Sequence, residues 1–234
     1  SMPRIQAGLK TSCMDSGMDT KYVALGTAGI LFICTLACSG AASPDKIELM
    51  AQGESFHNLT IITESTFPAA EPNAGPNGEL VFASNKDGNW DLYLKKNPTT
   101  KAIQKLTNHG AADRQPSISP NGEMVAFASN RSGNYDIFIA RTNGGTAKRQ
   151  VTESNEDEYL PTFSPDGNLV AYTRYSRMDA TPYIWTKDLS TGANVQLGPG
   201  MNPEFSPDGQ TILFQKASKA GDKWYGIWTM DING

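Results

Sequence analysis

Short apolar runs alternate with turn residues along most of the chain. Each of four Pro-Asn/Asp-Gly triplets is followed by four mostly apolar residues, at 80–83, 124–127, 169–172 and 211–214. Continuous apolar runs of this length are typical of strands buried on both faces. A second set of strand-like segments follows at 90–94, 135–139, 183–185 and 225–228. The pattern predicts an all-β fold of short antiparallel strands.

The triplets recur at a period typical of repeat proteins. They begin at residues 76, 120, 165 and 207, at intervals of 44, 45 and 42 residues. Proline presets φ at the second position of a turn, and glycine at the fourth position suits a type I turn. An x-Pro-x-x segment precedes each triplet, and short polar strands close the first three units at 103–107, 149–152 and 195–197.

One repeat therefore contains four antiparallel strands in about 44 residues, which is the size of a propeller blade. We expect a β-propeller of four-stranded antiparallel blades, small or partial, with four repeats visible. The blades are placed at about 70–107, 115–152, 160–198 and 201–234 within a propeller domain of residues 57–234. Residues 57–63 resemble an isolated fourth strand and are predicted to complete the last blade, covering an open sheet edge.

Residues 116–138, with the sequence PSISPNGEMVAFASNRSGNYDIF, resemble the repeat of TolB-type propellers and lack the Gly-His and Trp-Asp signature of WD repeats. The resemblance covers roughly residues 57–234. It implies a six-bladed ring preceded by an α/β domain, whereas residues 39–56 are too few for that domain and only four repeats are visible. We favour the interpretation that the chain is part of a larger propeller. The alternatives are a smaller ring and an assembly of several copies.

An uncharged, mostly apolar run at residues 22–37 precedes the repeats. Its sixteen residues are few for a bilayer span, which needs about 20, and fit the apolar region of a signal peptide. Residues 1–38 are therefore assigned as an N-terminal extension and export segment, and residues 39–56 as a linker. Leu36-Ala37-Cys38-Ser39 resembles the lipobox of bacterial lipoproteins, which would make Cys38 a lipidation site. Cleavage after Ala41 or Ala42 and an uncleaved anchor are the alternatives, and all three place the domain outside the cytoplasm.

Composition narrows the classes of function. The formal charge of −4 and the pI near 5.2 argue against a nucleic-acid partner, which favours a clustered basic face. The cysteines are Cys13, Cys34 and Cys38, so the repeats contain no thiol that could bind a metal or act as a nucleophile. His57 and His109 are the only imidazoles and are far apart in sequence.

No enzymatic motif is present. Residues 53–57 lack the final glycine of a Gly-x-Ser-x-Gly elbow, and neither His-Glu-x-x-His nor a phosphate-binding glycine loop occurs. We therefore predict no catalytic residue, no metal and no cofactor. The acidic stretch 153–159 is interpreted as a solvated turn, with a calcium site or a contact for a basic partner as the alternative.

Propeller geometry supplies the binding candidates. Loops that join the outer strand of one blade to the inner strand of the next open around the central channel on one face. That rule selects Glu71, Arg114, Gln115, Glu158, Tyr159, Met201 and Asn202. The TolB resemblance implies a receptor that binds a loop of its partner in the funnel-shaped entrance of this channel. For TolB-like propellers such a partner is the peptidoglycan-associated lipoprotein.

Two further sets of side chains are assigned structural roles. We expect inter-blade packing rather than ligand stacking for the repeated aromatic residues Trp90, Tyr135, Trp185, Trp224 and Trp228. Asp91 and Asp136 recur at one register and are expected to bind turn amides.

The resulting prediction is an exported, non-enzymatic binding or scaffold module of the cell envelope that recognises a protein or envelope polymer. A lipid anchor is one route to the membrane, and an incomplete ring would favour oligomers. The alternative is the propeller domain of a carbohydrate- or peptide-processing enzyme.

Overall fold

The computed structural model describes residues 23–25, 31–33, 68–97, 99–144, 148–178, 180–217 and 225–233. The chain divides into two units, Ser1–Thr66 and Phe67–Gly234. In the first unit, β1 (Val23–Leu25) pairs antiparallel with β2 (Leu31–Ile33). These two strands fall within the predicted export segment. Cys38, the linker 39–56 and the predicted strand 57–63 lie outside the described residues.

No helix in the described part of the chain is long and apolar enough to cross a membrane.

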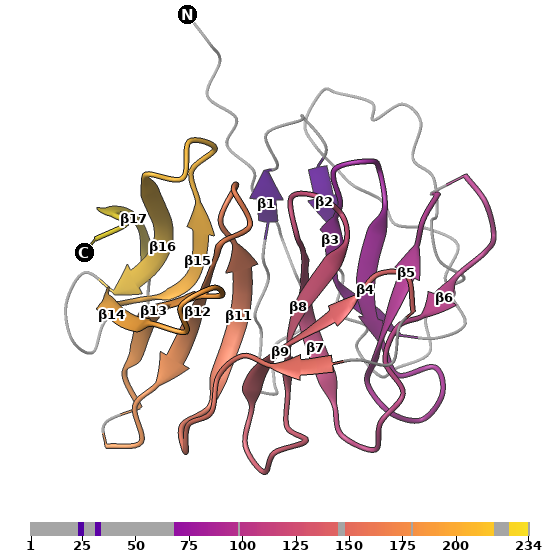
Figure 1. The fold of residues 1–234 in the computed structure, drawn as a ribbon, viewed down its shortest axis with the longest axis horizontal. Helices are drawn as coiled ribbons and strands as arrows, with labels where there is room; N and C mark the ends of the chain where they lie inside the picture. The colour runs from indigo at the N-terminus through magenta and orange to yellow at the C-terminus, as the bar shows by residue number, and fades with distance from the viewer. Residues whose placement is uncertain are drawn as a thin grey trace, which may run out of the picture. The chain divides into compact units, whose positions relative to one another are not determined.

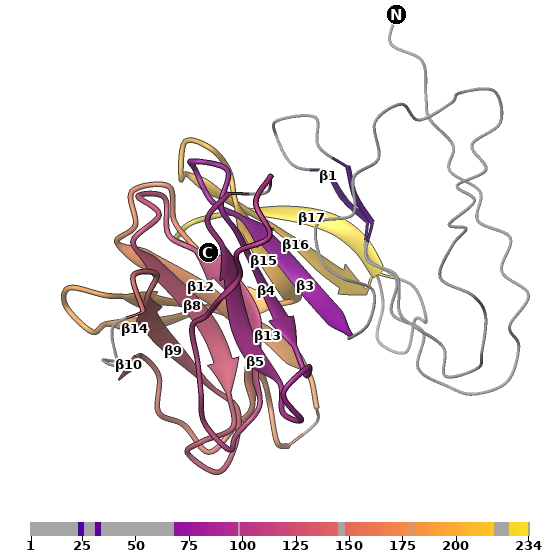
Figure 2. The ribbon, with the colours of Figure 1, turned by 90° about the vertical axis from the view of Figure 1, so that its right-hand side faces the viewer.

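The second unit consists of four consecutive antiparallel sheets, which confirms the predicted propeller fold. Figure 1 shows them side by side, from β3–β6 at the right to β15–β17 at the left, and Figure 2 shows the same sheets after a 90° turn. Three sheets have four strands, and the fourth has three among the described residues. We call them blades one to four.

The strands fall close to the predicted segments. Blade one contains β3 (Ala69–Ala74), β4 (Leu80–Ser84), β5 (Asp91–Lys95) and β6 (Gln104–Lys105). Blade two contains β7 (Asp113–Ile118), β8 (Met124–Ser129), β9 (Asp136–Arg141) and β10 (Lys148–Gln150). Blade three contains β11 (Glu158–Phe163), β12 (Leu169–Tyr175), β13 (Pro182–Asp188) and β14 (Asn194–Pro199). Blade four contains β15 (Met201–Phe205), β16 (Thr211–Ala217) and β17 (Tyr225–Asp231).

The Pro-Asn/Asp-Gly triplets form the predicted turns between the first two strands of each blade. In blade three the Gly167 amide donates to the Ser164 carbonyl at 2.8 Å, which closes the turn around Pro165 and Asp166. Equivalent bonds close the turns at Gly78, Gly122 and Gly209, and the φ angles of these four glycines lie between 71° and 83°. A left-handed backbone is the conformation that glycine adopts at low cost.

A second feature recurs in the first strand of each blade, where the residue before the strand proline has a left-handed backbone. Glu71, Gln115, Leu160 and Asn202 have φ of 54° or 55°. The pairing with the second strand shifts register at the same point in all four blades. Because a bulge re-aims neighbouring side chains, all four first strands turn their side chains in the same way.

Apolar side chains fill the space between successive blades. One core cluster joins blades one and two around Leu92 and Phe127, a second joins blades two and three around Ile137 and Tyr172, and a third joins blades three and four around Ile184. The first strands also contact one another in order, β3 with β7, β7 with β11 and β11 with β15. In the described residues no such cluster joins blade four to blade one.

Each of the first three blades also places a cation over its aromatic side chains. Phe127 and Phe138 stack at 6.0 Å, and Arg131 lies 4.7 Å from the Phe138 ring. Lys86 lies over Tyr93 in blade one, and Arg174 lies over Trp185 in blade three. Arg131 and Arg174 each also bind a buried carboxylate. Each of these two side chains therefore contributes both to aromatic packing and to an ion pair.

Candidate functional site

The first strands of blades one to three border an open hollow near their amino-terminal ends. It has a volume of about 250 Å³ and is lined by Glu71, Arg114, Gln115, Tyr135 and Tyr159. We call it the mouth hollow. Glu71 comes from β3, Arg114 and Gln115 from β7, and Tyr159 from β11, while Tyr135 directly precedes β9. Residues from three blades therefore meet at one place.

The charges of the mouth hollow neutralise each other. Arg114 Nη2 donates to Glu71 Oε1 at 2.7 Å, and the Arg114 guanidinium lies 4.2 Å from the Trp90 ring centre. The backbone N–H of Gln115 donates to Glu71 Oε2 at 2.8 Å. The Leu160 amide in turn donates to Gln115 Oε1 at 3.0 Å. The side chain at the left-handed position of one blade thus binds the backbone at the same position of the next.

Tyrosine rings form the other wall. Tyr135 and Tyr159 lie 4.9 Å apart between ring centres, and Tyr175 meets Tyr159 edge-on at 5.8 Å. Burial raises the pKa of Tyr159 to about 12, and the neighbouring Asp157, Tyr135 and Tyr175 act in the same direction. The Tyr159 hydroxyl is therefore a neutral hydrogen-bond donor at physiological pH.

The structure brings together four of the predicted binding residues and separates the others. Glu71, Arg114, Gln115 and Tyr159 line the mouth hollow. Met201 and Asn202, at the start of β15, are half-buried and do not line it. The backbone N–H of Asn202 donates to Thr173 Oγ1 at 3.0 Å. Tyr135 lines the hollow, although its repeated aromatic position predicts packing between blades. Its signal was the aromatic position it shares with Trp90, directly before the third strand.

Glu158 differs most from the expectation that it borders the channel, because its side chain is fully buried. It is the first residue of β11, and strand alternation turns it away from Tyr159 into the junction between blades two and three. Arg174 Nε donates to Glu158 Oε1 at 2.8 Å, while Glu158 Oε2 has no hydrogen-bond partner among the described residues. Burial raises the pKa of Glu158, and the neighbouring Thr152 side chain and the Arg174 charge oppose this shift.

The repeated aromatic and acidic positions have mainly structural contacts. Trp90 packs against the first inter-blade core, and Tyr135 and Trp185 pack against the second. Trp228 is 43% exposed, and Trp224 lies outside the described residues. Asp136 accepts the Ser154 amide, as expected, whereas Asp91 binds Lys105 at 2.9 Å and the Thr107 hydroxyl.

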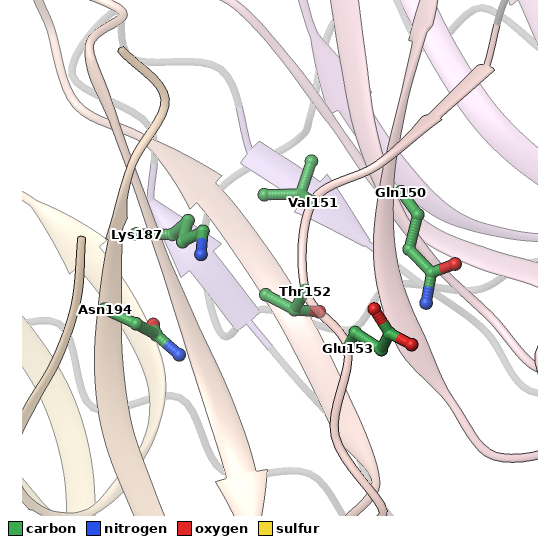
Figure 3. Close-up of a pocket in the computed structure, with 6 residues that line it drawn as sticks. All are labelled: Gln150, Val151, Thr152, Glu153, Lys187 and Asn194. Carbon is green, nitrogen blue, oxygen red and sulfur yellow. The ribbon is translucent and has the colours of Figure 1, made fainter. Parts of the chain in front are cut away.

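A second hollow, of about 280 Å³, lies between blades two and three (Figure 3). It is lined by Gln150, Val151, Thr152, Glu153, Lys187 and Asn194. Two of its polar groups are already engaged, because Gln150 Nε2 donates to Asp136 and Lys187 Nζ donates to the Gly192 carbonyl. The mouth hollow is the stronger candidate, because it joins three blades and retains neutral donors.

The part of the chain that the structure describes contains no cluster of three or more His, Cys, Asp or Glu side chains that could hold a metal ion. In the acidic stretch, Asp157 Oδ1 accepts the Tyr135 amide and Glu156 Oε1 accepts the Arg177 amide. These two carboxylates therefore hold neighbouring backbone in place.

The repeated blades define a propeller, and the mouth hollow at the start of their first strands is its stronger candidate binding surface. The family model of the TolB beta propeller domain matches residues 55–234, and the chain belongs to this family. Among solved structures, TolB from Acinetobacter baumannii matches with a TM-score of 0.59 and 23% identity, over 70% of this chain and 41% of that one. A putative TolB from Agrobacterium tumefaciens matches with a TM-score of 0.56 and 24% identity, over 62% of this chain and 57% of that one.

This chain thus spans about half the length of the two TolB structures. The acylaminoacyl peptidase from Pyrococcus horikoshii is also similar, with a TM-score of 0.53 and 12% identity over 72% of this chain and 31% of that one. Similarity at these identities shows the fold alone. The search of curated proteins found no match.

Proposed function

We propose that this chain is an exported, non-enzymatic binding module of the cell envelope, which holds a segment of a protein partner at the mouth hollow. The mouth hollow carries this proposal, because residues from three blades form one open site with paired charges and neutral donors. Membership of the TolB propeller family supports it. The export segment and a lipid anchor at Cys38 belong to the same proposal.

Photo-cross-linking from the mouth hollow tests this function. A photoreactive amino acid at position 159 should link the purified chain to one protein of an envelope extract. The same group at position 190, in the hairpin between β13 and β14, is the matched control, because that hairpin lies at the opposite end of blade three. Equal linkage from both positions, or none from position 159, would contradict the proposal.

The second candidate function is the propeller domain of a peptide-processing enzyme, which the similarity to the acylaminoacyl peptidase favours. In that case the propeller would accompany a catalytic domain. A peptidase activity that co-purifies with the native protein from its source would support this alternative.

A further inference from the structure

Two of the four blade turns carry the same reactive dipeptide. The segment Pro-Asn-Gly-Glu occurs at residues 76–79 in blade one and at residues 120–123 in blade two, whereas blades three and four have aspartate in place of the asparagine. Asparagine before glycine is prone to deamidation, because glycine has no side chain to hinder attack of its backbone nitrogen on the asparagine amide. Asn77 and Asn121 are both exposed. Because the two segments are identical, a difference in their reactivity must come from their surroundings.

In blade two the turn holds both of the groups that would react. The Gly122 N–H donates to the Ser119 carbonyl at 2.8 Å. Asn121 Oδ1 accepts from the Ser119 hydroxyl at 2.7 Å and from the backbone N–H of Glu123 at 3.1 Å. Cyclisation requires the glycine nitrogen and the asparagine carbonyl group to leave these partners and come together. Three hydrogen bonds therefore oppose the reaction in this turn.

In blade one a glycine stands where the other turns have serine. Gly75 occupies the position of Ser119, and within the described ranges Asn77 Oδ1 accepts no hydrogen bond. The Gly78 N–H donates to the Gly75 carbonyl over a longer distance, 3.3 Å. The Glu79 carboxylate accepts from the backbone N–H of Asn77 at 2.9 Å and from Asn77 Nδ2 at 3.0 Å. These two bonds hold neither the Gly78 nitrogen nor the Asn77 carbonyl oxygen, so both reacting groups are less restrained than in blade two.

From these contacts we infer that Asn77 is a site of spontaneous deamidation through a succinimide, and that the blade-two turn protects Asn121. The Gly78 backbone nitrogen attacks Asn77 Cγ, and the new nitrogen–carbon bond forms as the side-chain nitrogen leaves as ammonia with the glycine proton. Water then opens the ring at either carbonyl and gives aspartate or isoaspartate. Asn143 and Asn233 also precede glycine but have no counterpart in an identical turn. The inference is independent of the proposed function.

The product places a second carboxylate where the turns of blades one and two meet. Asn77 Nδ2, which donates to Glu79 Oε1, becomes an oxygen, so a hydrogen bond is replaced by repulsion between like charges. Both side chains lie against the blade-two turn, since Asn77 Nδ2 and Glu79 Oε1 are 3.3 Å from the position that a Cβ would take on Gly122. Aspartate at position 121 would instead reproduce the turns of blades three and four, in which a serine hydroxyl donates to the aspartate.

Peptide mapping of the full chain by mass spectrometry, during incubation at mildly alkaline pH, measures conversion at both positions. We expect Asn77 to convert about tenfold faster than Asn121, because opening the blade-two turn breaks at least one further hydrogen bond. In urea, where the turns are lost, the two rates should become equal. Ser119→Ala removes the turn hydroxyl and should raise the rate at Asn121 several-fold. Ser164→Ala, the same change in blade three, is the matched control and should leave that rate unchanged.

Equal rates in the folded chain, or faster conversion at Asn121, would overturn the inference. A difference that persists in urea would also overturn it, because the fold would then not be its cause. The variants Asn77→Asp and Asn121→Asp test the consequence of the reaction. The first should lower the midpoint of thermal unfolding, and the second should leave it unchanged. A lower midpoint in the second variant alone would contradict the roles assigned to the two turns.

Discussion

Asp113 and Glu158 occupy the same position in successive blades, two residues before the left-handed residue, and both side chains are fully buried. Both oxygens of Asp113 accept from Arg131 Nη2, at 2.7 and 2.9 Å. Glu158 has one more methylene and binds Arg174 through Oε1 alone. A buried oxygen without a partner opposes folding, so the two ion pairs should contribute differently to stability.

The variant Glu158→Gln tests this difference through pH. Burial raises the pKa of Glu158 in the folded chain above the unfolded value of 4.5, so the folded chain holds the proton more tightly. The free energy of unfolding contributed by this group therefore increases as pH falls through the raised pKa. In urea unfolding at neutral pH we expect the variant to be at least as stable as the wild type. That advantage should shrink as pH falls towards the unfolded pKa.

Asp113→Asn is the companion measurement at the equivalent site. It removes the charge from a carboxylate whose oxygens are both bonded, so we expect a loss of about 1.5–3 kcal/mol in the free energy of unfolding at neutral pH. If both variants lost the same stability at neutral pH, the unpartnered oxygen of Glu158 would have no energetic consequence.

At the scale of elements, the turn chemistry of the sequence predicts the strands well. Proline and glycine at fixed spacing determine where each blade turns, and the bonds at Gly122 and Gly167 form as expected. The first residue of β11 was harder to place. The spacing of the repeats predicts a loop at Glu158, but the strand begins there, and alternation turns its side chain into the core.

The mouth hollow was predictable only in part, because the register of adjacent blades decides which side chains meet. The loop rule selected Gln115 and Tyr159. The hydrogen bond from the Leu160 amide to Gln115 depends on the offset between β7 and β11 along the strand direction, which the sequence of neither strand determines alone. Tyr135 lies in the hairpin between β8 and β9, within blade two. The loop rule considers only loops between blades, so it could not select this residue.

The hairpin between β12 and β13 offers a test of backbone strain. Ala180 is exposed and has φ of 56°, a conformation that costs alanine about 1–2 kcal/mol relative to glycine. Ala180→Gly relieves this strain, and the gain exceeds the extra conformational entropy that glycine loses on folding. The variant should therefore raise the free energy of unfolding by about 0.5–1 kcal/mol. Ala193→Gly, at an exposed residue without positive φ, should lower it by about as much. Thermal unfolding of both variants measures the contrast, and a loss of stability in both would contradict the account.

At the scale of the whole molecule, the blades are joined through the apolar faces of their sheets. The face of blade two towards blade three is covered, and Ile137 is 0% exposed. The same face of blade four leaves Leu213 and Ile227 42% and 68% exposed. Ile137 and Ile227 occupy equivalent positions in their third strands, directly before the aromatic residues Phe138 and Trp228 that pair with the second strands.

This equivalence gives a matched pair of substitutions. Ile137→Ala should lower the free energy of unfolding by about 2–5 kcal/mol, because it empties space between two packed blades. Ile227→Ala should change it by no more than about 0.5 kcal/mol, because the side chain is largely in solvent. Denaturant unfolding of both variants provides the comparison. Similar losses would mean that blade four is covered on this face in solution.

Binding of a partner segment where the first three blades meet is tested by hydrogen exchange in the unmodified chain, with and without the envelope protein that the photo-cross-link identifies. We expect slower exchange at the start of β7 and β11, at the backbone amides of Arg114 and Tyr159. Exchange in the hairpin between β13 and β14 should remain unchanged. Slower exchange in that hairpin, with none at β7 and β11, would contradict binding at the mouth hollow.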